Sequence, residues 1–82
     1  MNDKTVRDAM IDTVLKQIDA NEPPVARETY DRLIFGGHTN NQALRLMANV
    51  LREEMNRMLT DATPFDEKRY AAQLAKIPSG DD

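Results

Sequence analysis

Apolar residues recur at helical spacing along almost the whole chain, and no segment alternates with the period of two that a half-buried strand shows. The glycines and prolines fall at the boundaries of the apolar segments. The pattern therefore predicts an all-α fold with four helices, over residues 5–20, 24–35, 40–59 and 67–76. We expect one helical domain over residues 1–78 and a flexible acidic tail over residues 79–82.

Prolines separate the first two predicted helices. Pro23 and Pro24 end one helix, because the residue before a proline avoids helical backbone angles, and they start the next, because proline is tolerated in a first turn. On the second helix the spacing places Arg32 on the side that faces water. Phe35 falls on the polar side of the same helix, so we expect its ring to fold over the following turn.

The segment "LIFGGHTNNQALRLM" contains the connection between the second and third helices. Gly36 can close the second helix in a left-handed conformation, and Gly37 and His38 complete a tight turn. We expect His38 to pack beside this turn or to help cap the helix. Thr39 and Gln42 have the spacing of a capping box, in which each side chain binds the other residue's backbone N–H.

The fourth helix also has a recognisable start. Asp66 is a suitable N-cap, and Phe65 and Tyr70 are spaced to form a hydrophobic staple across it.

The third helix is apolar around an arc of roughly 220° at 100° per residue, whereas a surface helix usually has an apolar stripe near 100° wide. This width indicates either a central helix that the other three contact or a helix that pairs with a second copy of the chain. The candidate interface residues are Leu44, Met47, Leu51, Met55 and Met58, together with Phe35 from the second helix.

Glu54 lies near the middle of this apolar arc. A buried carboxylate must be paired or protonated. We expect a partner arginine, either Arg57 one turn on or one from another helix. The alternatives are a functional carboxylate with a raised pKa and a side chain that reaches water.

The opposite face of the third helix carries Arg45, Asn49, Arg52 and Asn56. Arginine and asparagine read guanine and adenine in DNA, and the helix, glycine turn and capped helix have the outline of a helix-turn-helix motif. A solvated polar face explains the same residues. The net charge of −3 argues against a nucleic-acid binder, which is usually clearly basic.

The composition favours no catalytic or cofactor site. The chain has one histidine, no cysteine and no recognisable spacing of nucleophile, phosphate-loop or metal-ligand residues. Its apolar runs are too short for a membrane span. We therefore expect a cytoplasmic protein that is not an enzyme and needs no cofactor.

The pieces "PPVARETYDRL", "QALRLMANVLREEM" and "PFDEKRYAAQLAKIP" resemble a family of small bacterial helical proteins of unknown function. The resemblance covers about two-thirds of the chain, from Pro23 to Pro78, and its motifs are structural. It implies a compact bacterial helical domain and no particular activity. The turn is also similar to that of ubiquitin-associated three-helix domains, although Gly36-Gly37-His38 replaces their methionine–glycine–aromatic loop.

These observations favour a small protein–protein interaction module that associates with itself as a homodimer or with another protein. The alternative is a DNA-binding regulator that uses the turn at residues 36–39 and the polar face of the third helix.

Overall fold

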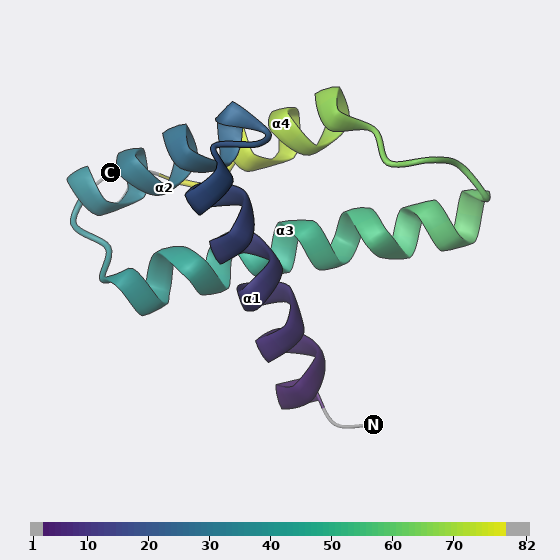
Figure 1. Cartoon of the computed structure of the whole chain (residues 1–82), viewed down its shortest axis with the longest axis horizontal. Helices are drawn as coiled ribbons and strands as arrows, with labels where there is room; N and C mark the ends of the chain where they lie inside the picture. The colour runs from purple at the N-terminus through teal and green to yellow at the C-terminus, as the bar shows by residue number, and fades with distance from the viewer. Residues whose placement is uncertain (1–2, 79–82) are drawn as a thin grey trace.

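The computed structural model describes residues 3–78, which form four helices joined by short connections (Figure 1). The helices are α1 (Asp3–Ala20), α2 (Pro24–Phe35), α3 (Asn40–Asp61) and α4 (Glu67–Ala75). The prediction of an all-α fold is confirmed, and residues 3–78 contain no strand. The predicted tail at residues 79–82 lies outside the described residues.

Helix α3 is the helix around which the others are arranged. Figure 1 shows α2 and α4 along one side of α3, while α1 crosses α3 near its middle. Helix α3 contacts all three other helices, and α1, α2 and α3 also contact one another. The central position predicted for the third helix is therefore confirmed, and it explains most of the wide apolar arc.

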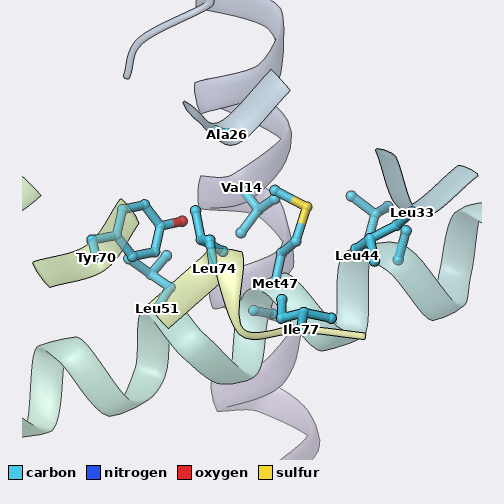
Figure 2. Packing of buried hydrophobic residues seen from close by; sticks show 11 residues of the cluster. Val14, Ala26, Leu33, Leu44, Met47, Leu51, Tyr70, Leu74 and Ile77 are labelled. Carbon is cyan, nitrogen blue, oxygen red and sulfur yellow. The ribbon is translucent and has the colours of Figure 1, made fainter. Parts of the chain in front are cut away.

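The core is built by side chains from every helix (Figure 2). Val14, Leu33, Met47 and Leu74, from α1, α2, α3 and α4 respectively, are fully buried. Alanines are also buried on α2 and α3, and small side chains allow helix axes to approach closely.

The turn between α2 and α3 is built as predicted except for its left-handed residue. Gly36 has a right-handed φ of −78°, whereas Gly37 has a φ of +106°, so Gly37 is the residue that needs glycine's freedom. The backbone N–H of His38 donates to the carbonyl of Leu33, and its Nδ1 lies 3.2 Å from the same oxygen. His38 thus helps to close α2.

The capping box at the start of α3 is present. Thr39 Oγ1 accepts from the Gln42 N–H at 3.1 Å, and Gln42 Oε1 accepts from the Thr39 N–H at 2.9 Å. The other end of α3 closes differently, with Ala62 in the left-handed region at φ 53° and ψ 43°. This conformation costs a residue with a Cβ roughly 1–2 kcal/mol.

Candidate interaction surface at the end of the third helix

The candidate interface residues divide between the core and the surface. Leu44, Met47 and Leu51 are at most 4% exposed, so they stabilise the single chain and cannot meet a second copy while it stays folded. Met55 is 37% exposed and Met58 is half-buried. Of the candidate interface residues on α3, only those near its C-terminal end are accessible, and the interface itself stays a prediction.

Three residues, Met55, Met58 and Leu59, form what we call the apolar end of α3. Their spacing of i, i+3 and i+4 places them on one side of the helix. Leu59 is 83% exposed, because α1 crosses α3 further back along the helix (Figure 1). Leu59 belongs to the predicted apolar arc but was not among the candidate interface residues.

Phe35 forms a second exposed apolar site at the opposite end of α3, where α2 ends. Its side chain is 95% exposed, so the expectation that the ring folds over the glycine turn is wrong. The turn is short, because both the backbone N–H and the ring of His38 contact the Leu33 carbonyl, and the turn leaves the Phe35 side chain in solvent. Phe35 and the apolar end are therefore separate sites.

Glu54 is buried and paired with an arginine from α4. Arg69 Nε donates to Oε1 at 2.8 Å and Arg69 Nη2 donates to Oε2 at 2.6 Å, and only 1% of the Glu54 side chain is exposed. The expected ion pair is present, and its partner comes from another helix rather than being Arg57.

The Arg69 hydrogen bonds hold the pKa of Glu54 below its ordinary value of 4.5, although burial acts in the opposite direction. The charge of Arg69, a hydrogen bond from the Asp66 backbone and the charge of Arg57 lower this pKa further. The alternative of a functional carboxylate with a raised pKa is therefore wrong.

Two further polar side chains hold α4 in place. Arg32 donates from Nη1 to the Ile77 carbonyl at 2.8 Å and from Nη2 to the Leu74 carbonyl at 3.0 Å. Arg32 therefore does not face water as expected, because its guanidinium binds one carbonyl in the last turn of α4 and one just beyond the end of that helix. Tyr70 donates to Gln17 Oε1 at 2.9 Å, and burial raises the pKa of Tyr70 to about 12.

Gln17, Arg32 and Glu54 thus bind α4 from α1, α2 and α3 respectively, and we call these three residues the α4 socket. The predicted cap and staple complete the start of α4. Asp66 Oδ1 accepts from the Arg69 N–H at 3.0 Å, and the rings of Phe65 and Tyr70 meet edge-on with centroids 5.4 Å apart.

The candidate nucleic-acid face lies on the solvent side of α3. Arg45, Asn49 and Asn56 are exposed and Arg52 is half-buried. Towards the end of the helix this face borders an open depression whose lining includes Glu53 and Asp61. Arg57 lines the same depression, so two carboxylates face one guanidinium there, and the excess negative charge would repel a phosphate backbone.

Comparison with protein-family models, with curated proteins and with solved structures finds no match. The resemblance to a bacterial helical family therefore stays a prediction. Within residues 3–78, no helix is long and apolar enough to cross a membrane. The same residues contain no group of three or more histidine, aspartate or glutamate side chains arranged to hold a metal ion.

Proposed function

We propose that this chain is a small, non-enzymatic interaction module that associates with itself through the apolar end of α3. The carrying observation is the 83% exposure of Leu59, on the same side of the helix as Met55 and Met58. Burying one large apolar side chain contributes about 1.5–3 kcal/mol, so a partner that covers this end gains binding free energy. As part of this proposal we place the module in a bacterial cytoplasm; the sequence resemblance bears on the bacterial origin alone.

A second copy suits this surface for a geometric reason. Two identical helices related by a two-fold axis present the same side chains to each other, so a single contact covers both apolar ends. Apolar residues at i, i+3 and i+4 are the pattern with which helices pack against one another.

Molar mass measured by light scattering across a hundredfold concentration range tests this function. We expect the unmodified chain to reach dimer mass and Leu59→Lys to remain a monomer, because the ammonium group would be buried at the contact. Thr60→Lys is the matched control, since it adds the same charge one residue further on at an exposed polar position, and it should still dimerise. A monomeric unmodified chain, or a Leu59→Lys protein that dimerises equally well, contradicts the proposal.

DNA binding through the polar face of α3 is the second candidate, favoured by the exposure of Arg45, Asn49 and Asn56 on one side. It ranks below self-association because Glu53 and Asp61 border that face. Fluorescence anisotropy with a DNA duplex at low salt tests it. Binding that is lost in the Arg45→Ala and Arg52→Ala double variant would favour this function, and no binding by the unmodified chain would exclude it for that duplex.

A further inference from the structure

Helix α4 is joined to the other helices by residues 62–66, which we call the hinge. Figure 1 shows the hinge leaving the far end of α3 and turning back, so that α4 returns along α3. Helix α4 packs against α2 and α3. Helices α1, α2 and α3 contact one another without its help, so the surface on which α4 rests is assembled by the rest of the chain.

The α4 socket recognises α4 through specific chemistry at both of its ends. Glu54 binds the guanidinium of Arg69 near the start of the helix, and Arg32 binds two carbonyl oxygens near its end. Tyr70 and Leu74 are fully buried between these contacts. An α4 helix from a second copy carries the same groups at the same spacing, so it would satisfy the socket equally well.

The hinge supplies a reason for the chain to open. Ala62 has φ 53°, a left-handed conformation that glycine adopts readily and alanine does not. Pro64 lies two residues further on and restricts how the remaining hinge can bend. A short hinge under strain favours the exchange of an element between copies. We expect Ala62 to leave the left-handed region when the hinge extends, at the expense of the hydrogen bonds from the Ala62 and Thr63 N–H groups to the Met58 carbonyl.

We propose that the second copy is bound by exchange of α4, so that α4 of each copy occupies the α4 socket of the other. This inference rests on the proposed self-association and specifies its partner surface. The apolar end of α3 immediately precedes the hinge, so we expect Leu59 to lie close to the second chain in an exchanged dimer. Exchange of α4 would therefore explain both why Leu59 is exposed in the single chain and why Ala62 has a left-handed conformation there.

A charge-reversal pair tests the exchange directly. Glu54→Arg alone places two arginines in each socket, and Arg69→Glu alone places two glutamates there, so neither variant should form a stable helical protein. An equimolar mixture of the two, unfolded and refolded together, should give a one-to-one heterodimer. In that dimer one socket pairs the introduced arginine with the introduced glutamate, and the other contains the native pair. Native mass spectrometry gives the composition and circular dichroism the helix content.

The exchange would be overturned if the mixture showed no heterodimer by native mass spectrometry and no more helix content than the average of the two separate variants. If two chains instead pair through their surfaces while each keeps its own α4, every variant chain retains two like charges at positions 54 and 69. Mixing the two variants would then restore neither folding nor a heterodimer. Because a buried arginine can also block folding outright, a second experiment leaves the α4 socket untouched.

Hinge variants provide this second experiment. Ala62→Gly removes the left-handed strain and should lower the dimer association constant at least about threefold, whereas Ala62→Val increases the strain and should raise it by a similar factor. Ala62 is exposed, so neither change touches the core. Equal association constants for all three proteins contradict the exchange. If Leu59→Lys still abolishes the dimer in that case, the proposed function stands and the exchange alone is wrong. A monomeric unmodified chain contradicts both.

Discussion

The two ends of α3 carry similar apolar patterns but have different environments. At the N-terminal end a capping box satisfies the backbone, and Leu44 and Met47 are buried against other helices. At the C-terminal end Leu59 is 83% exposed and Ala62 closes the helix in a left-handed conformation. The difference arises from the partners: α1 crosses near the middle of α3, so the last turns of α3 extend past it (Figure 1). An apolar stripe thus shows which side of a helix can be buried. How much of that side is buried depends on how far the neighbouring helices extend along it.

The largest expected difference is in the free energy of unfolding when the same leucine-to-alanine substitution is made at a buried and at an exposed position of α3. Leu51→Ala should lower the free energy of unfolding by about 2–5 kcal/mol, because Leu51 is 1% exposed and the change leaves a cavity. Leu59→Ala should change the stability of the monomer by less than about 0.5 kcal/mol. Urea denaturation at low protein concentration measures both values. Equal losses would contradict the contrast, and a stable Leu51→Ala protein would contradict the placement of the core.

The next largest effect concerns how α4 is attached to the C-terminal half of α3. Arg69→Met should lower the free energy of unfolding by about 3 kcal/mol, because it leaves the buried Glu54 carboxylate without its partner. The double variant Glu54→Leu and Arg69→Met should recover most of this loss, since apolar residues of similar size can replace a buried ion pair. Thermal unfolding of the two variants measures the difference. A double variant no more stable than Arg69→Met would contradict this explanation.

Lowering the pH should reduce the free energy of unfolding by a smaller amount, because it weakens the Glu54–Arg69 ion pair that holds α4 against α3. Glu54 has a lower pKa in the folded chain than its ordinary value of 4.5, so the unfolded chain binds a proton more readily. The stabilisation is therefore complete above that ordinary value and is lost as the pH falls through the folded pKa. Glu54→Gln should lack this part of the acid dependence, as urea midpoints measured between about pH 6 and pH 3 would show. Identical pH profiles for the two proteins would rule out this role for Glu54.

The smallest expected changes in the free energy of unfolding come from the residues that cap the two ends of α3, and the two changes have opposite signs. Thr39→Ala removes a cap and should lower the free energy of unfolding by about 1 kcal/mol. Ala62→Gly relieves a left-handed alanine and should raise it by about 0.5–1 kcal/mol. Chemical denaturation of the monomer resolves both shifts. A destabilising Ala62→Gly would show that Ala62 is not strained.

Much of the fold follows from local chemistry that the sequence states directly. The capping box at Thr39, the Asp66 cap and the Phe65–Tyr70 staple are all present, because each depends on residues only a few positions apart. The four helices follow from apolar periodicity and proline positions for the same reason.

The features that the sequence missed depend on distant partners. The roles of Arg69 and Arg32 required knowing where α4 docks, and the exposure of Leu59 required knowing where α1 crosses α3. Periodicity places these residues around a helix axis but does not say which neighbour meets them. Likewise, two adjacent glycines did not reveal that Gly37, rather than Gly36, is left-handed.

The measurement that tests the difference between the ends most directly is a concentration series of backbone amide NMR spectra. With increasing protein concentration, we expect signals from residues 55–66 to shift or broaden while signals from residues 39–48 stay unchanged. That result would assign the association surface to the C-terminal end of α3 and the adjoining hinge. Concentration-dependent shifts centred on residues 35–48 instead, or none at any concentration, would contradict the account.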